Sequence, residues 1–213
     1  MNGNFKFYNL AKILVIPILK KALPYEVIGA ENIPTDGPAI IYSKHIGFLD
    51  PVMIASATNR WIHYFATREV FLFPLNLIFR NLGCMPIDRM PQDKYKLWKK
   101  IHGPEINTKM NRKSIKEGYK KLRTGELVGI FPEAHRVRPI GAYGNFEPGG
   151  IKLAQTADVN IIPVYINRIK VGRYFRTHTQ IIIGKSFKVE RRLPGEEATE
   201  LAIQKIKQLE QGK

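Results

Sequence analysis

Residues 39–51 have the sequence AIIYSKHIGFLDP, which joins an apolar run to a short connection and then to a helix start. The β-branched and aromatic residues at 39–43 favour a buried strand. Asp50 is a preferred helix N-cap and Pro51 a preferred first helical residue, so a helix is expected to begin there. The stretch predicts a strand–turn–helix unit with His45 and Asp50 in its connection.

The same alternation of strands and helices continues along the chain. Further strand-like runs lie at 25–28, 61–66, 84–87, 127–131, 161–166 and 180–183. Helical periodicity is found at 51–58, 108–123, 150–157 and about 196–210. This alternation predicts the α/β class, with a single domain built on a central mixed, largely parallel sheet flanked by helices. Pro163 lacks an N–H, so it is expected at an edge or a bulge of its strand.

Length and charge limit the classes of protein that the chain can belong to. It has 213 residues, which is room for one sizeable domain. It carries 34 Lys and Arg against 18 Asp and Glu, a formal net charge of +16, which indicates nucleic acid, an anionic membrane face or a phosphorylated substrate as partner. Residues 94–123 hold eleven of the cations and two acids, which suits a phosphate-binding surface or simply a solvated face. The single cysteine, Cys84, excludes an intramolecular disulfide framework and a C-x-x-C site.

Residues 1–24 are expected to form an amphipathic helical segment, kinked or divided at Pro17. The segment holds four lysines and no acid, and the lysines fall within about half of a helical wheel. This pattern suits a helix lying on anionic lipid. It also suits a terminal helix packed on its own domain with solvated lysines, and the amphipathicity leaves both open.

Neither a signal peptide nor a membrane-spanning helix is expected. The apolar core at 13–19 contains a proline, two lysines follow it, and no small-x-small cleavage site is present. The longest charge-free apolar stretch, 70–79 (VFLFPLNLIF), is about half of the roughly 20 residues that a spanning helix needs.

His45 and Asp50 form a candidate catalytic dyad at the end of a strand, where α/β folds place their sites. A histidine titrates near neutrality, so it can accept a proton from a hydroxyl, and a carboxylate on its other ring nitrogen fixes the tautomer. The His-x4-Asp spacing alone is common by chance. A loop histidine bonded to backbone, followed by a capping aspartate, would explain the same residues.

Two further strand ends carry charged residues. Residues 83–89 (GCMPIDR) end in Asp88-Arg89, and residues 127–136 (LVGIFPEAHR) place Glu133 and Arg136 after a buried strand. Arginine offers a planar fork that matches phosphate oxygens. A surface Glu/Arg pair would explain the second sequence equally.

Taken in order, these motifs resemble those of the glycerolipid acyltransferase family, whose best-known members are the 1-acylglycerol-3-phosphate acyltransferases. The motifs are His-x4-Asp, Ile-Asp-Arg, Phe-Pro-Glu-x-x-Arg and Ile-Pro-Val, and the resemblance extends from about Gly29 to Tyr165. It implies transfer of a fatty acyl group from acyl-CoA or acyl-carrier protein to the hydroxyl of a lysophospholipid, most simply 1-acylglycerol 3-phosphate, to give phosphatidic acid.

The resemblance also implies roles for particular residues. His45 would be the general base and Asp50 its orienting partner, while Arg89, Glu133 and Arg136 would bind the phosphorylated acceptor. The implied mechanism needs no metal and no cofactor beyond the acyl donor.

Members of this family tend to dock on the bilayer through an amphipathic N-terminal segment. The resemblance therefore implies that the chain has two parts. Residues 1–24 would be a membrane-contact segment, residues 25–213 the acyltransferase domain, and the apolar stretch 70–79 could contribute to the contact. The expected location is the cytoplasmic face of a membrane, held peripherally or monotopically on anionic lipid. The oligomeric state stays open.

The sequence also departs from the family pattern. Lys44 stands where the family usually has Asn, and Ala134, His135 and Val137 replace Gly, Thr and Ser of the third motif. A loop within 90–107 is inserted between the second and third motifs. These changes leave the dyad chemistry intact and make a different acceptor an alternative.

Other classes of function fit less well. A basic nucleic-acid- or anionic-surface-binding protein without catalysis would explain the charge. However, no RNP-like aromatic strand and no zinc-finger spacing is present, so no nucleic-acid partner is expected. A serine hydrolase is disfavoured because none of the four serines lies in a G-x-S-x-G elbow.

Overall fold

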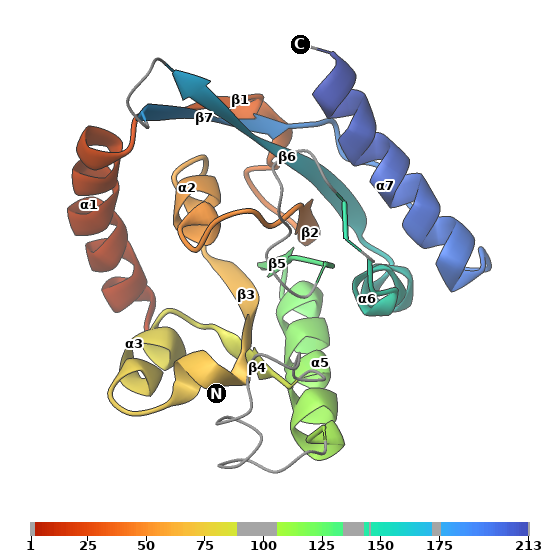
Figure 1. Ribbon diagram of the computed structural model, residues 1–213. Helices are drawn as coiled ribbons and strands as arrows, with labels where there is room; N and C mark the ends of the chain where they lie inside the picture. Colours follow the sequence, from red (N-terminus) through yellow and green to blue (C-terminus); the bar gives the residue numbers. More distant parts are fainter. Residues whose placement is uncertain (1–2, 89–105, 134–142, 145, 172–175, 213) are drawn as a thin grey trace.

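The sheet at the centre of the molecule has seven strands within the described part of the chain, in the order β1-β7-β6-β2-β5-β3-β4. The structure is a computed structural model that describes residues 3–88, 106–133, 143–144, 146–171 and 176–212 (Figure 1). The strands are β1 (Tyr25–Ile28), β2 (Ala39–Ser43), β3 (Ile62–Thr67), β4 (Met85–Ile87), β5 (Leu127–Ile130), β6 (Asn160–Val171) and β7 (Arg176–Ile183). The helices are α1 (Phe5–Ala22), α2 (Asp50–Ala55), α3 (Leu75–Asn81), α5 (Thr108–Arg123), α6 (Gly149–Ala157) and α7 (Gly195–Gln211), with short 3₁₀ turns η1 (Ala30–Asn32) and η2 (Arg68–Phe71).

Strand direction confirms the expected mixed, largely parallel sheet. Strands β6, β2, β5, β3 and β4 run parallel to one another, while β7 pairs with β6 antiparallel and β1 joins β7 in parallel. Strands β2 and β5 are adjacent in the middle of the sheet, with Tyr42 paired to Ile130 near their carboxyl ends. The connections that leave these two strands therefore meet at one edge of the sheet.

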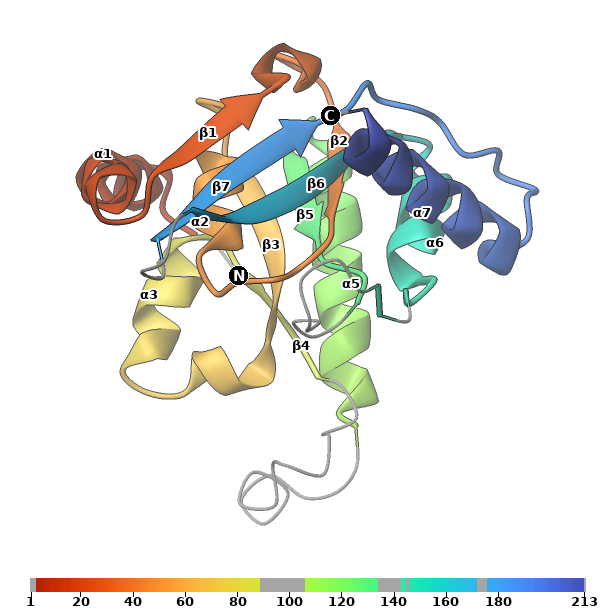
Figure 2. The same ribbon diagram turned by 45° about the horizontal axis from the view of Figure 1, so that its top comes forward.

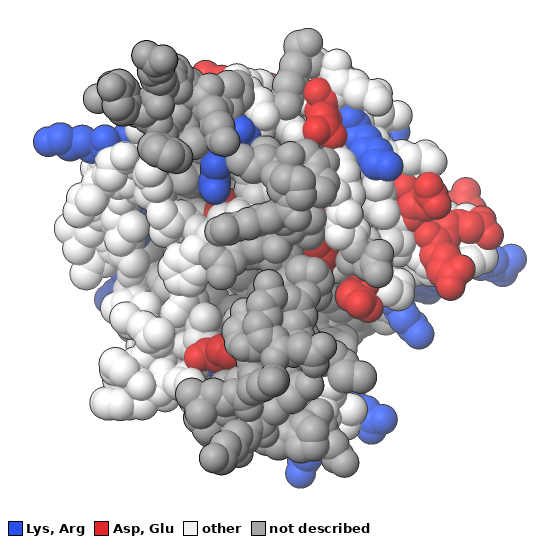
Figure 3. All heavy atoms as spheres, viewed as in Figure 1, with Lys and Arg blue, Asp and Glu red and all other residues white. Residues whose placement is uncertain are grey.

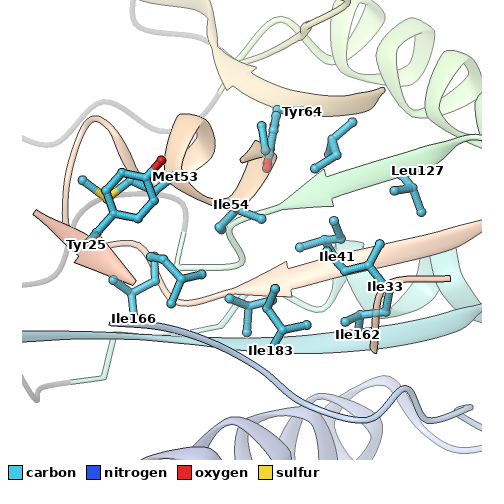
Figure 4. Packing of buried hydrophobic residues seen from close by; sticks show 14 of the residues in the cluster. Tyr25, Ile33, Ile41, Met53, Ile54, Tyr64, Leu127, Ile162, Ile166 and Ile183 are labelled. Carbon is cyan, nitrogen blue, oxygen red and sulfur yellow. The ribbon is translucent and has the colours of Figure 1, made fainter. Parts of the chain in front are cut away.

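Two layers of helices cover the sheet. Helices α1, α2 and α3 lie on one face and α5, α6 and α7 on the other (Figures 1 and 2). Each face has its own apolar cluster, because successive strand residues point to opposite sides. Ile41 joins the cluster with α2, part of which Figure 4 shows, whereas Ile40 and Tyr42 join the cluster with α6 and α7.

Helix α1 is one element that continues through Pro17, so the expected division does not occur. Tyr8 and Leu19 are its buried residues, and Lys12 Nζ donates a hydrogen bond to the Thr58 carbonyl of the domain. These three contacts fix which side of the helix faces the protein. None of the helices in the described ranges is both long enough and apolar enough to cross a bilayer.

Pro163 lies in β6, which has neighbours on both sides, so the expected edge position is wrong. The pairing between β6 and the chain beside it shifts by one residue between the pairs Ile161–Phe187 and Val164–Ile183. The Pro163 carbonyl accepts from Gly184 N at 2.9 Å on that same side. Pro163 therefore lies at an irregularity of the strand pairing, where its lack of an N–H is tolerated. This agrees with the expected bulge.

Candidate active site

The connections after β2 and β5 form the site. Residues 44–49 join β2 to α2, and Phe131, Pro132 and Glu133 follow β5. Since β2 and β5 are parallel neighbours, both connections leave the sheet at its carboxyl edge. Residues far apart in the sequence thus reach one place.

The His45–Asp50 pair is formed. His45 Nδ1 lies 2.9 Å from Asp50 Oδ2, and the same oxygen accepts from the backbone N–H groups of Ile46 at 2.8 Å and Gly47 at 2.7 Å. Asp50 is fully buried. It is the first residue of α2 and its carboxylate turns back to the connection, whereas the capping explanation had placed it before the helix. The connection is folded around this one oxygen.

The geometry leaves His45 with a basic nitrogen. An ionised carboxylate only accepts hydrogen bonds, so Nδ1 carries the proton in the neutral ring and Nε2 keeps its lone pair. The His45 side chain retains 21% of its exposure, which lets a substrate hydroxyl reach it. The Phe131 ring lies against the imidazole at 4.3 Å between centroids, and the Tyr64 ring stacks on Phe131 at 5.7 Å. This stack limits the orientations of the ring.

Glu133 joins the connections from β2 and β5. Its side chain is fully buried, with Oε2 accepting from His45 N at 3.0 Å and Oε1 accepting from Gly144 N at 3.1 Å. Both carboxylate oxygens are thus engaged by backbone amides. The expected role of Glu133 in binding the acceptor stays a prediction.

Arg168 is a residue of the site that the sequence analysis missed. Its Nη2 lies 3.4 Å from Asp50 Oδ1, the oxygen that His45 does not use. Gly47 permits this approach, since a Cβ there would lie 2.5 Å from Arg168 Nη2 and 2.9 Å from Asp50 Oδ1. The sequence predicts a strand that ends at Ile166, two residues before Arg168, whereas β6 continues to Val171.

Lys44 lies on the other side of β2 from the dyad. It is buried, with Nζ 4.0 Å from the centre of the Tyr143 ring and 5.9 Å from that of Tyr165. The hydroxyls of these tyrosines donate to the two carboxylate oxygens of Glu210 at 2.8 and 2.7 Å. Burial and Glu210 raise the pKa of both tyrosines. The side chain of Lys44, which stands where the family usually has Asn, therefore lies beside α7 and away from the His45–Asp50 pair.

Two of the expected site residues, Arg89 and Arg136, lie outside the described residues, as does His135. Asp88, which precedes Arg89, is buried at the end of β4 and accepts from Arg68 Nη1 at 3.0 Å and from Asn107 N at 2.9 Å. Asp88 therefore fixes the start of α5 to the carboxyl edge of the sheet. No group of three or more His, Cys, Asp and Glu within the described ranges is placed to hold a metal ion.

The chain is similar to known proteins in both sequence and fold. The family model described as Acyltransferase matches residues 24–167. A protein named 1-acyl-sn-glycerol-3-phosphate acyltransferase from Bacillus subtilis (strain 168) is 26% identical over 87% of this chain and 87% of its own length. Its namesake from Pseudomonas aeruginosa is 32% identical over 71% of this chain, which spans about half (51%) of that relative.

A solved structure shows the same fold. It is that of the 1-acyl-sn-glycerophosphate (LPA) acyltransferase PlsC from Thermotoga maritima, with a TM-score of 0.60 and 20% identity over 97% of this chain and 78% of that one. The family match covers more than half of the chain and contains both members of the dyad. The chain therefore belongs to the Acyltransferase family and is an enzyme of acyl transfer.

Proposed function

We propose that the protein transfers a fatty acyl group from a thioester donor to the hydroxyl of 1-acylglycerol 3-phosphate, which gives phosphatidic acid. The observation that carries the proposal is the His45–Asp50 pair, with Nε2 of the partly exposed imidazole free to act as a base. The names of the Bacillus and Pseudomonas relatives support this acceptor.

His45 acts as general base and then as general acid. Nε2 takes the proton of the acceptor hydroxyl as its oxygen attacks the thioester carbonyl carbon. The tetrahedral intermediate collapses, the C–S bond breaks, and the imidazolium returns the proton to the leaving thiolate. Asp50 stabilises the imidazolium between these steps through its hydrogen bond to Nδ1. Arg168, on the other oxygen of Asp50, helps to hold that carboxylate in place.

The acceptor is held by charge. We assign Arg89 and Arg136 to its phosphate, because a guanidinium matches two phosphate oxygens at once. Glu133 is assigned to the same acceptor-binding set, and its contacts with His45 N and Gly144 N keep the start of the third motif beside the dyad. Such positioning supplies several kcal/mol of the reduction in barrier, on the order seen for preorganised reactants.

Membrane contact through residues 1–24 is supported by the outer face of α1. Leu10, Ile13, Leu14 and Ile18 are exposed at i, i+3, i+4 and i+8, which places them together on the side opposite Lys12. Lys6 and Lys21 are exposed near the two ends of this face. An apolar stripe bounded by lysines is the pattern of a helix that lies in a lipid interface.

Helix α3 extends this apolar surface. The exposed side chains on α3 and the turn before it are Leu72, Phe73, Leu75, Leu77 and Ile78. Helices α1 and α3 are in contact, and in Figure 3 the side of the molecule formed by them is largely free of charged atoms. Phe48, in the connection that carries His45, is 63% exposed. These exposed groups support peripheral attachment, and the lysines favour the anionic cytoplasmic leaflet.

An assay of acyl transfer tests the reaction. The wild type, His45→Ala, Asp50→Asn and a surface control, His178→Ala, are given a radiolabelled acyl thioester and a panel of charged and uncharged acceptors. Loss of the base is expected to lower kcat about 10²- to 10⁴-fold in His45→Ala, and loss of the correct tautomer to lower it comparably in Asp50→Asn. His178→Ala keeps wild-type turnover. Unchanged turnover in His45→Ala would contradict the mechanism, and product from uncharged acceptors alone would contradict the phosphate assignment.

A sedimentation assay with anionic vesicles tests the attachment. The double variant Ile13→Asp/Leu14→Asp is expected to bind at least tenfold more weakly, because burying each such side chain in lipid is worth about 2 kcal/mol. Ile115→Asp changes an exposed apolar residue on the other helical layer and is expected to bind as the wild type does. Equal binding by all three proteins would remove α1 from the attachment.

A further inference from the structure

The outer face of α5 carries one sign of charge. Six exposed cations recur at i, i+3, i+4, i+7, i+11 and i+14, and they are called here the basic stripe: Lys109, Arg112, Lys113, Lys116, Lys120 and Arg123. At 3.6 residues per turn they fall within an arc of about 100° and extend for about 20 Å. The stripe is therefore a continuous cationic surface along the whole helix.

The basic stripe opposes the stability of its own helix. Cations at spacings of three and four residues, such as Lys109 with Arg112 and Lys116 with Lys120, repel one another. The first turn has no acidic residue and carries Lys109, although the positive end of the helix dipole favours acids there. Glu117 is the one acid of α5, and it is half-buried beside the stripe. An anionic partner would relieve this repulsion.

Lipid is not the partner that fits the basic stripe. Leu122 of α5 packs into the apolar cluster on one side of the sheet, whereas Leu19 of α1 and Phe79 of α3 pack on the other side. Figures 1 and 2 show α1 and α3 separated from α5 by the sheet. A flat bilayer that touches the apolar surface of α1 and α3 leaves the basic stripe in water. The stripe thus faces the phase from which a soluble acyl donor arrives.

The position and length of the basic stripe fit a donor of protein size. Its first residues lie at the carboxyl edge of the sheet, where Asn107 N bonds Asp88 and where the connection with His45 also lies. The phosphates of a nucleotide are compact, whereas six cations along about 20 Å complement an extended acidic surface. A partner bound here can extend a thioester arm toward the site.

We propose that the basic stripe of α5 docks an acidic, water-soluble protein that carries the acyl thioester. The proposal rests on the proposed function and adds the surface at which a protein-borne donor docks. The acceptor then approaches from the lipid side of the sheet and the donor from the aqueous side.

The test compares three donors with the same acyl chain: acyl-carrier protein, acyl-CoA and acyl-pantetheine, which has neither a protein nor a nucleotide. Lys109→Glu/Arg112→Glu/Lys116→Glu reverses the stripe, and Lys152→Glu/Lys185→Glu/Arg192→Glu reverses three exposed cations elsewhere. The stripe variant is expected to raise KM for the carrier-protein donor at least tenfold, with kcat and both small donors within twofold of wild type. The control variant changes KM for the carrier-protein donor less than twofold. Added salt raises that KM in the wild type and in the control variant, and much less in the stripe variant.

The following results overturn the docking proposal. An unchanged KM for the carrier-protein donor, or a wild type that does not use it, excludes docking at the stripe. An equal loss with acyl-pantetheine shows damage to the site, and a loss with acyl-CoA alone assigns the stripe to a nucleotide. Weaker vesicle binding assigns it to lipid, and loss of nucleic-acid binding with unchanged donor kinetics assigns it to nucleic acid. A wild type that forms no phosphatidic acid from any donor contradicts the proposed function instead.

Discussion

Asp50 is the residue on which the geometry of the site depends. Its Oδ2 organises His45, Ile46 and Gly47, and its Oδ1 is left to Arg168. A buried carboxylate is stable only when its oxygens are paired, and here both are. The hydrogen bonds that bury Asp50 are thus the same ones that orient His45.

Gly47 is expected to be essential for activity, although it has no side chain to react. In Gly47→Ala the added Cβ meets the Arg168 guanidinium at 2.5 Å and Asp50 Oδ1 at 2.9 Å. The guanidinium can move away, but the buried carboxylate cannot move without disturbing His45. We expect kcat to fall by about tenfold or more, since small misplacements at a reacting centre have large effects.

Steady-state kinetics with circular dichroism checks this expectation. Gly149→Ala is the matched control, because a Cβ there meets nothing within 4 Å. Normal turnover in a folded Gly47→Ala protein would show that the Arg168–Asp50 contact is dispensable.

The sequence predicts local contacts of the site better than distant ones. His45 and Asp50 are five positions apart, so their pairing follows from one connection. The contact of Glu133 with His45 N, and that of Arg168 with Asp50, depend on how β5 and β6 lie beside β2. A single sequence shows no register between strands. The one signal for Arg168 is that the alternation of β6 continues past Ile166.

At the scale of elements, the strands and helices expected from hydrophobic periodicity are present, and the failures have physical causes. Helix α3 was not expected, because residues 70–79 were treated only as an apolar stretch. Leu75, Leu77 and Ile78 are exposed and only Phe79 packs inward, so no inward-facing periodicity marks the helix. Strand β6 runs to Val171 because β7 pairs with it, and charged residues concealed that length in the sequence.

His63 links three elements and is expected to make stability depend on pH. Its ring, buried in β3, contacts Glu126 before β5 at 2.6 Å and Gly83 O before β4 at 3.1 Å. Burial lowers the pKa of His63 and Lys121 acts in the same direction, while Glu126 opposes them. The unfolded chain binds a proton on His63 below about pH 6.5, whereas the folded protein binds that proton only at a lower pH. The free energy of unfolding therefore falls as the pH falls below about 6.5.

Urea unfolding at several pH values measures this effect. His63→Gln is expected to show a smaller loss of unfolding free energy than the wild type between pH 7 and pH 5. The difference has an upper limit of about 1.4 kcal/mol per pH unit for one proton. His178→Gln, which alters an exposed histidine, should keep the wild-type profile. Parallel profiles for His63→Gln and the wild type would contradict the assignment.

At the scale of the whole molecule, the sheet divides two apolar clusters, and the surfaces above them differ. The layer of α1 and α3 presents apolar groups, and the layer of α5 presents cations. Composition predicts the net charge but not this separation, because only the fold assigns each helix to a face. Among the described residues, the cations of the basic stripe therefore form a surface distinct from the apolar one.

Cys84 reports on the integrity of the molecule. Its thiol is buried beside β3 and β4, and burial raises its pKa to about 12. The thiolate is the reactive form, so a thiol reagent at pH 8 is expected to label the native protein slowly and the unfolded chain at once. Labelling followed by mass spectrometry across a urea series checks this. Rapid labelling without denaturant would show that this region opens locally.

The carboxylate of Glu133 also sets when the enzyme can become active during its synthesis. It holds the amide of His45, a residue 88 positions earlier. At the usual 5–20 residues per second, a ribosome adds this intervening length in roughly 4–18 s. During that interval the nascent chain contains His45 and Asp50 but lacks the carboxylate that holds the His45 amide. Acyl transfer therefore begins only after β5 has been translated and has joined β2.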